Sequence, residues 1–405
     1  MVPVAFRIPF LELDVPGYGL ALTIGFLLSV AWAVRRATRS GANPDVVLNC
    51  AFIALIGGVV GARAMYVVHY PEQVIPANAG AVQTLLAVVN VRQGGLEVYG
   101  GVLLAAVTAV GYLLVRRHSL RWYLDIIAPS LALGMGLGRI GCFLNGCCWG
   151  HQCDLPWGVR FPFGSNAMIE QWYDGRPGLE LPQELINAPP HGMLVTGESA
   201  SPLPRDVLLM KERDVEKYLP VWRELKELVA LQAQAKTSRE QQEIARRAAR
   251  LGCQADTAQK YGLVLEALDR HGLSLAQLQE LARPHRALPV HPTQLYSTIV
   301  LVLLALFLSA LYWRRTRDGQ VICAFMVLEP WSRYLLEIIR ADNPQDTFSM
   351  TVSQFIGALL VVTGVVGWLV LQRLPARSVR AVRWEPEVAA AAEGADKAGR
   401  PARGR

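Results

Sequence analysis

The stretch with the most chemical potential in this chain is Gly134–Gly150, which reads GMGLGRIGCFLNGCCWG. It closes an apolar run that begins near Tyr123, so Arg139 lies inside a predicted membrane helix. An arginine at the centre of such a helix costs about 2.5 to 3.5 kcal/mol on insertion scales, and it usually faces a cavity, a partner charge or a ligand. Arg139 is therefore the first candidate functional residue. The alternative is an arginine that snorkels to the interface from near the helix end.

A second set of charges forms a ladder in another apolar run, where Glu329, Arg333 and Glu337 are four residues apart and Arg340 follows three later. Residues at this spacing lie along one face of a helix, where opposite charges neutralise one another. The ladder is either a salt-bridge staple between helices or a device in which the acids aim the arginines at a phosphate. Arginine suits a phosphate because its planar fork binds two oxygens and does not deprotonate.

The composition indicates a membrane protein with several spans. Of 405 residues, 52% are hydrophobic and 18% are charged, which is too apolar for a soluble chain of this length. The net charge of +7 needs no nucleic acid as a partner, because arginine-rich loops between spans produce it. Seven apolar runs are long enough to cross roughly 30 Å of hydrocarbon. They are residues 17–35, 46–69, 98–115, 123–145, 292–313, 320–340 and 350–371.

These runs predict an all-α polytopic membrane protein with an outer-face inserted head. Arginine clusters follow the first, third, fifth and last spans, which predicts an outer N-terminus and a cytoplasmic C-terminus. We expect four helices with a short outer re-entrant segment, a periplasmic head of loops and strands followed by charged helices, three more helices, and a disordered tail. The first four helices lie within residues 1–150, with the re-entrant segment at 76–92. The head covers 151–290, with its charged helices at 205–284. The last three helices cover 291–373, and the tail covers 374–405.

The predicted orientation gives each unusual polar residue a depth. The second, fourth and sixth spans run outward, so Arg63, Arg139 and Arg333 lie about two-thirds of the way to the outer face. The inward-running spans carry polar groups at their outer ends, namely Tyr18, Tyr99, His291, Gln294 and Tyr296. A layer of cations just below the outer headgroups predicts a site for an anionic lipid head, open sideways to the bilayer.

The glycine-rich segment 94–101, GGLEVYGG, surrounds Tyr99. A helix that starts there points backbone N–H groups at the predicted site, which favours an anion, and Gly100 and Gly101 allow close approach. A tight turn before a helix is the alternative interpretation.

Four cysteines fall close together, at Cys142, Cys147, Cys148 and Cys153. They do not form a CxxC pair, and adjacent cysteines suit a tetrahedral zinc site poorly. Disulfides or small buried side chains are favoured over a metal on an outer face. The prediction is that no metal is bound.

The motifs taken together resemble those of the bacterial prolipoprotein diacylglyceryl transferase family. The most specific is GLGRIGCFLNGCCWG, and the combination with the others carries the resemblance over roughly residues 10–160 and 288–372. The others are Tyr18-Gly19, Gly61-Ala62-Arg63 with Tyr66, GGLEVYGG, the segment HPTQLY at 291–296, and Arg333-Tyr334 with Glu337 and Arg340.

The resemblance implies an enzyme of the bacterial cytoplasmic membrane. Such enzymes move the diacylglyceryl group of phosphatidylglycerol onto the lipobox cysteine thiol of a prolipoprotein signal peptide, where a thioether forms and glycerol phosphate leaves. The implied partners are phosphatidylglycerol, prolipoprotein signal peptides and membrane lipids, without nucleic acid and without a metal or organic cofactor. We expect a monomer.

Several positions depart from the family pattern. Tyr99 stands where the motif has histidine, Cys142 where it has asparagine, Cys147-Cys148 where it has an acidic residue, and Glu329 where a tyrosine is common. A subfamily with these residues fits the pattern, and so does a catalytically silent paralogue that binds lipids or signal peptides. An anion transporter is disfavoured, because the inner halves of the spans are rich in leucine, valine and alanine.

The predicted roles follow from residue chemistry. Arg139 and Arg333 grip the phosphate and stabilise the charge that grows on it. Tyr99 and His291 are candidate bases for the substrate thiol, although His291 before Pro292 is equally suited to a capping role. The remaining predicted site residues bind substrate or support the site, and they are Tyr18, Arg63, Gly100, Gly101, Asn145, Gln294, Tyr296, Glu337 and Arg340.

Overall fold

A computed structural model describes most of the chain and divides it into two compact units. The described residues are 4–8, 13–74, 80–90, 95–187, 200–234, 261–341 and 351–384, with isolated positions between 237 and 258. The bundle unit consists of the described residues within Ala5–Gly141 and Leu295–Ile338 and those after Pro344. The head unit consists of Val4 and the described residues within Cys142–Gln294 and Ile339–Asn343.

The described chain is mostly helical, which confirms the predicted all-α class. The long helices are α1 (Gly17–Ser40), α2 (Pro44–His69), α5 (Val98–Val115), α6 (Leu120–Asn145), α13 (Thr293–Arg314), α14 (Gln320–Ile339) and α15 (Val352–Arg373). Among them, α1, α2, α5, α6, α13 and α15 are long and apolar enough to cross a membrane. Helix α14 has the length, but it carries three charged residues in its second half, Glu329, Arg333 and Glu337, and is not among these six.

Local sequence signals set where these helices begin and end. Asn43 caps α2 by accepting a hydrogen bond from the Asp45 N–H at 2.9 Å, and Pro44 takes the first helical position. Gly41 ends α1 with a left-handed φ of 73°. A capping box between Thr351 and Gln354 starts α15.

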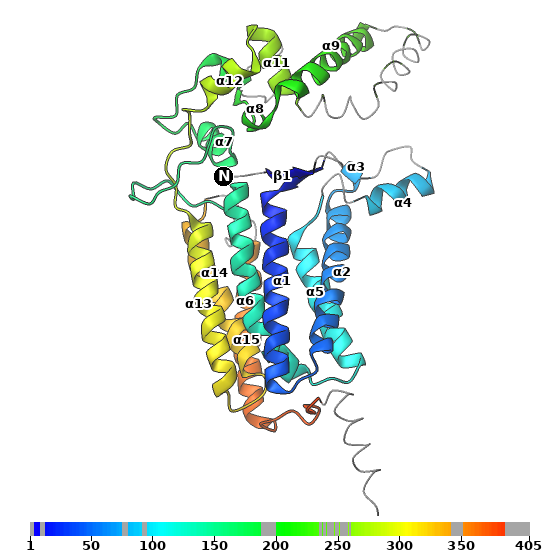
Figure 1. Cartoon of the computed structure of the whole chain (residues 1–405), viewed down its shortest axis with the longest axis vertical. Coiled ribbons are helices and arrows are strands. Elements are labelled where there is room, and N and C mark those ends of the chain that lie inside the picture. Colours follow the sequence, from blue (N-terminus) through cyan, green and yellow to red (C-terminus); the bar gives the residue numbers. More distant parts are fainter. Residues whose placement is uncertain are drawn as a thin grey trace, which may run out of the picture. The chain divides into compact units, whose positions relative to one another are not determined.

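Small residues set the spacing of the first helices in the bundle unit, where α1, α2 and α5 lie side by side (Figure 1). A Cβ on Gly61 of α2 would overlap the main-chain carbonyl of Gly100 in α5. A Cβ on Gly101 would come within 2.9 Å of the Gly58 oxygen. In lipid the hydrophobic effect does not hold helices together. Van der Waals contact between closely packed backbones, as seen here, does so instead.

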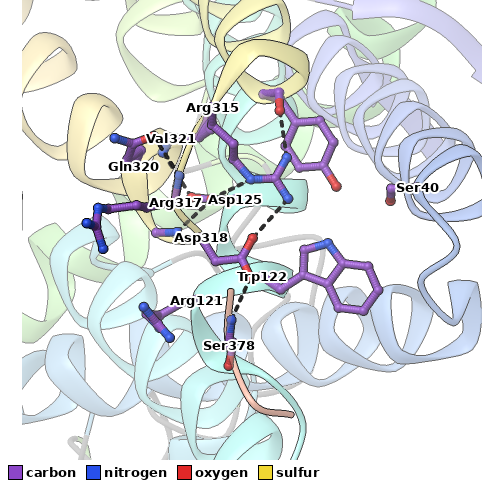
Figure 2. Close-up of polar contacts among 12 residues, drawn as sticks. Ser40, Arg121, Trp122, Asp125, Arg315, Arg317, Asp318, Gln320, Val321 and Ser378 are labelled. Atoms are coloured by element: carbon purple, nitrogen blue, oxygen red, sulfur yellow. Dashed lines mark hydrogen bonds and ion pairs between the residues drawn. The ribbon is translucent and has the colours of Figure 1, made fainter. Parts of the chain in front are cut away.

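A buried polar cluster links α6 to the turn before α14, as Figure 2 shows. We call Asp125, Arg315 and Asp318 the closed cluster. Asp125 is 0% exposed and accepts hydrogen bonds from the Gly319, Val321 and Ile322 N–H groups at 2.7, 3.0 and 2.9 Å. Arg315 forms ion pairs with Asp125 at 3.2 Å and with Asp318 at 3.3 Å. Because α14 receives its N-terminal acceptor from another helix, the cluster fixes where it starts.

The head unit has a core of its own. Phe161, Phe163, Met168, Leu203 and Leu265 are almost fully buried in one cluster. Its elements are α7 (Asn166–Tyr173), the 3-10 helix Gln183–Leu185, the paired strands β3 (Ile186–Asn187) and β4 (Ser201–Pro202), α8 (Asp206–Leu209), α9 (Glu212–Gln234), α11 (Gly262–His271) and α12 (Leu275–Ala282). Along the chain, α7 and the short strands therefore come before the longer helices of this unit.

The remaining elements are short. Strands β1 (Val4–Ile8) and β2 (Leu13–Pro16) form a two-stranded sheet. Within the predicted outer segment 76–92 the structure describes α4 (Ala81–Val89), which follows α3 (Pro71–Val74), while 75–79 and 91–94 lie outside the described residues.

The start of the predicted disordered tail has defined contacts, so that prediction is wrong for residues 374–384. The Ser378 N–H donates to Asp318 at 2.9 Å, and the Trp384 N–H donates to the Gly41 carbonyl at 2.8 Å. Low apolar content predicted disorder, but main-chain bonds to the bundle hold this segment. Residues 385–405 lie outside the described residues.

Candidate active site

Two of the predicted arginines meet at one buried carboxylate in the bundle unit. Arg139 of α6 and Arg333 of α14 both interact electrostatically with Glu329, which is 8% exposed. The Nε of Arg333 also donates to the hydroxyl of Ser353 at the start of α15. Three helices therefore contribute to one group of charges, which we call the open pair, Arg139 and Arg333 with Glu329.

The open pair is short of negative charge and of hydrogen-bond acceptors. One carboxylate faces two guanidinium groups. Arg139 forms no hydrogen bond or ion pair with any residue that the structure describes. A guanidinium in such a place has five N–H donors to satisfy, and an anion with several oxygens satisfies them best.

Aromatic and hydroxyl groups of neighbouring helices lie along the same part of α6. A Cβ on Gly141 would contact the Tyr18 ring at 3.1 Å, so Tyr18 packs closely on α6 and remains 38% exposed. In α13, Thr298 donates to the Gly136 carbonyl at 3.1 Å, and Tyr296 lies half-buried two residues earlier. The bundle unit thus brings Tyr18 and α13 close to the helix that carries Arg139.

Arg63 is held by main-chain carbonyls. Its Nε donates to Val88 at 2.8 Å, and its two Nη atoms donate to Ala87 at 2.8 Å and to Gly95 at 3.0 Å. The guanidinium also lies 5.7 Å from the centre of the Tyr66 ring. These contacts tie the segment around α4 to α2, which is a supporting role.

Tyr99 lies in the first turn of α5 and is 37% exposed. The two glycines after it pack on α2, and the Gly101 N–H donates to the Glu97 carbonyl at 3.3 Å within the helix. Gly94 lies outside the described residues. Gly100 and Gly101 therefore position Tyr99 by close helix packing.

In the head unit, the turn after α6 is the point where several predicted site residues meet. Arg205 donates to the main-chain oxygen of Asn145 at 2.9 Å and to its carboxamide oxygen at 3.4 Å. Gln294, which is 1% exposed, donates to the Cys147 carbonyl at 2.7 Å. Asn145 and Gln294 thus shape the turn through main-chain contacts.

Gly150 lies between two further predicted residues. Its N–H donates to the His291 carbonyl at 3.0 Å, and a Cβ on Gly150 would come within 2.7 Å of the His291 Cβ. Gly150 also pairs with Arg340 in an antiparallel bridge. Arg340 donates from Nη2 to the Cys148 sulfur at 3.4 Å. His291 and Arg340 are thus fixed at the main chain beside the cysteine turn, while Glu337 is buried in α14.

Three of the cysteines form a cluster. The sulfurs of Cys142, Cys147 and Cys148 all lie within 4.8 Å of one another. The cysteines that the structure describes form no disulfide, so of the two alternatives favoured from the sequence it shows side chains without disulfides. Cys153 is buried outside this group.

Sequence reasoning missed the partners that tertiary structure supplies. The charge ladder left Glu329 either in a staple between helices or among acids that aim the arginines, and the structure adds Arg139 of α6 as the partner that the spacing could not name. Ser353 and Arg205 were not singled out, because a serine at a helix start and an arginine in a loop carry no distinctive signal.

Comparison with known proteins shows the family of this chain. The chain matches the family described as prolipoprotein diacylglyceryl transferase over residues 3–370. This match covers most of the chain, and the structure has several helices long enough to cross a membrane. The chain therefore belongs to the prolipoprotein diacylglyceryl transferase family.

Several curated relatives share the name phosphatidylglycerol--prolipoprotein diacylglyceryl transferase. The protein of Rhodopirellula baltica is 38% identical over 164 residues, which are 40% of this chain and 32% of that protein. That of Clostridium tetani is 33% identical over 161 residues, 40% of this chain and 61% of the relative. That of Pseudoalteromonas translucida is 31% identical over 181 residues, which are 43% of this chain and 65% of that protein. The chain thus aligns with less than two thirds of the length of each.

Proposed function

We propose that this chain transfers the diacylglyceryl group from phosphatidylglycerol to the thiol of a lipobox cysteine in a prolipoprotein signal peptide. Membership of the family and the names of its relatives support the reaction. The single observation that carries it is the open pair, in which Arg139 has no hydrogen-bond partner among the described residues. A lipid phosphodiester supplies the oxygens that this guanidinium lacks.

The open pair stabilises the departing phosphate. The thiolate sulfur attacks the glyceryl carbon that carries the phosphate ester oxygen, and a C–S bond forms as the C–O bond breaks. The electron pair remains on glycerol phosphate, where negative charge grows. Arg139 and Arg333 oppose that charge in a place with little water, and Glu329 holds the two guanidiniums together before the lipid arrives.

The attacking group is a thiolate, so the substrate thiol must lose its proton. Tyr99 and His291 are the candidate bases. Histidine has the better intrinsic pKa for this step, whereas Tyr99 is the more exposed side chain at the start of a helix. Arg63 in the bundle unit, and Arg340 and Gln294 in the head unit, each hold their own segments in place through main-chain contacts.

The arginine clusters favour one orientation, with the N-terminus outside and the C-terminus in the cytoplasm of the bacterial inner membrane. In that orientation the signal peptide reaches the site from the bilayer and the outer face. The enzyme acts as a monomer, since one chain contains all the residues assigned here.

A direct test uses purified protein, phosphatidylglycerol and a synthetic lipobox peptide. Mass spectrometry is expected to detect the diacylglyceryl thioether on the peptide cysteine and glycerol phosphate in solution. The matched control is the same peptide with serine in place of cysteine, which gives no product. Binding of both substrates without any thioether would identify a silent lipid-binding or peptide-binding paralogue instead.

The identity of the base is tested by Tyr99→Phe and His291→Ala in the same assay. Loss of the proton acceptor is expected to lower the rate by about 100-fold or more at pH 7, with a smaller loss at pH 9, where the substrate thiol ionises unaided. Full rate in both variants would exclude both residues as the base.

A further inference from the structure

The three clustered thiols are brought together by an unusual turn. Helix α6 ends at Asn145, and Gly146 follows with a left-handed φ of 76°. Cys148 also has a positive φ, of 63°, which is uncommon for a residue with a side chain. Two left-handed residues within three positions curl the chain back on α6. The adjacent cysteines, which a regular turn would point apart, therefore both face Cys142.

The turn is held from outside by strong contacts. Gln294 donates to the Cys147 carbonyl at 2.7 Å, and Thr293 donates to the Cys148 carbonyl at 2.5 Å. The Gly146 N–H donates to the Cys142 carbonyl at 2.8 Å. A strained backbone conformation persists only where surrounding structure enforces it, and such places cluster at functional sites. Here the enforced feature is the convergence of three sulfurs.

The three sulfurs contact one another and one guanidinium group. The Cys142 thiol hydrogen-bonds with Cys147 and Cys148, so the three sulfurs already interact directly. Arg340 Nη2 lies 3.4 Å from the Cys148 sulfur. A guanidinium at that distance stabilises negative charge on sulfur. All three residues are half-buried.

We propose that Cys142, Cys147 and Cys148 bind one Zn²⁺ ion and leave its fourth position open to an exogenous thiolate. Zinc takes sulfur ligands at about 2.3 Å in a tetrahedral arrangement, and three protein ligands with one open position define a reactive site. Binding releases three thiol protons and gives the site a net charge of −1, which Arg340 offsets. The objection from adjacent cysteines does not apply, because the turn brings both sulfurs to one side.

The open position suits the substrate of the proposed function, and this part of the inference rests on that function. A thiol that binds Zn²⁺ loses its proton to water and becomes a metal-bound thiolate. The lipobox cysteine is such a thiol, so zinc would supply the deprotonation that Tyr99 or His291 otherwise provides.

The test measures metal first and activity separately. Purified wild-type protein, loaded with Zn²⁺ and dialysed against metal-free buffer, is expected to keep about one zinc per chain. The variant Cys142→Ser/Cys147→Ser/Cys148→Ser is expected to lose at least 80% of it, roughly the loss that follows removal of all three ligands. Cys153→Ser, a buried cysteine of the same unit, is the matched control and keeps the metal. Wild-type protein without zinc, or a triple variant that retains it, would overturn the site.

Cobalt replaces zinc for the second measurement. Co²⁺-loaded wild-type protein is expected to absorb through thiolate-to-cobalt charge transfer, and a lipobox peptide should intensify that band. The serine version of the peptide should leave it unchanged. An unchanged band with the cysteine peptide would overturn the open position. Zinc binding without any thioether product would instead count against the proposed function alone, and the single variants Cys142→Ser and Cys148→Ser separate ligand loss from misfolding by their melting temperatures.

Discussion

The closed cluster and the open pair both combine arginines with acidic residues in the bundle unit, but they differ in how many of their charged groups are paired. In the closed cluster, Asp125 accepts three main-chain hydrogen bonds and pairs with Arg315, which also reaches Asp318 (Figure 2). In the open pair, two guanidiniums share Glu329, and Arg139 has no hydrogen bond to any described residue.

The difference separates structure from function. Buried charges are costly unless they are paired and hydrogen-bonded. In the closed cluster protein atoms pair every charge, and Arg315 Nε is the one buried atom that has an ion pair with Asp125 but no hydrogen bond among the described residues. Among the described residues the open pair lacks such partners for Arg139, and we expect an added anion to supply them. We infer that charges paired by protein atoms stabilise the fold, and that charges without enough protein partners form a binding site.

The largest effect is expected from breaking the closed cluster. Asp125→Ala leaves three N–H groups without their acceptor and removes one of the two carboxylates that pair with Arg315, which should lower the free energy of unfolding by about 3 to 5 kcal/mol. Thermal unfolding in detergent measures it. The control Asp45→Ala removes an exposed carboxylate at the start of α2 and should cost less than about 1 kcal/mol. Equal losses in the two variants would contradict the structural role.

The open pair should behave in the opposite way. Arg139→Ala should lower the rate of lipid transfer by about 100-fold to 1,000-fold, as loss of one anion-stabilising donor does. Its melting temperature should stay close to that of the wild type, because Arg139 bonds to no described residue. A variant that melts early and transfers at the normal rate would reverse the comparison.

Helix packing gives an intermediate effect. Gly61→Ala forces a methyl group against the Gly100 carbonyl, which should destabilise the bundle by about 1 to 3 kcal/mol. Gly111→Ala on α5 is the matched control, since no atom lies within 4 Å of its added Cβ. It should be neutral or slightly stabilising. Similar melting temperatures for the two variants would refute the close contact.

The smallest effect is expected in the head unit, where water screens charges. Burial raises the pKa of Glu266, but the hydrogen bond and charge of Lys226 outweigh it and leave that pKa lowered. The resulting stability is present above the unfolded-state pKa of about 4.3 and is lost as pH falls through the lower folded-state value. Glu266→Gln should cost less than about 1 kcal/mol at pH 7 and nothing near pH 3. Unfolding curves across this pH range measure the difference in stability between the wild type and the variant. A difference that grows as the pH falls would contradict the prediction.

Hydropathy was enough to predict the long helices, because each must cover its main-chain groups in lipid. The bounds of α5 agree with the prediction at both ends. Spacing also singled out Arg139 and Arg333. It did not reveal Asp125 as the cap of α14, because that contact joins residues about 200 positions apart in the chain.

The cysteine turn marks another limit of sequence reasoning. Gly146 after the helix end is a recognisable signal for a left-handed residue. Cys148 gives no such signal, because its positive φ is imposed by contacts from Thr293 and by the chain around Gly150. The adjacent cysteines were therefore judged unsuited to one site until the backbone was known.

The central claim is that the open pair binds a lipid phosphate, and lipid binding in nanodiscs tests it most directly. Wild-type protein and Arg35→Gln, which removes an exposed charge of α1, should bind phosphatidylglycerol equally. Arg139→Gln and Arg333→Gln should each bind it about 10-fold to 100-fold more weakly, the range for a charged hydrogen bond of 1.5 to 3 kcal/mol. Unchanged affinity in both variants would contradict the account.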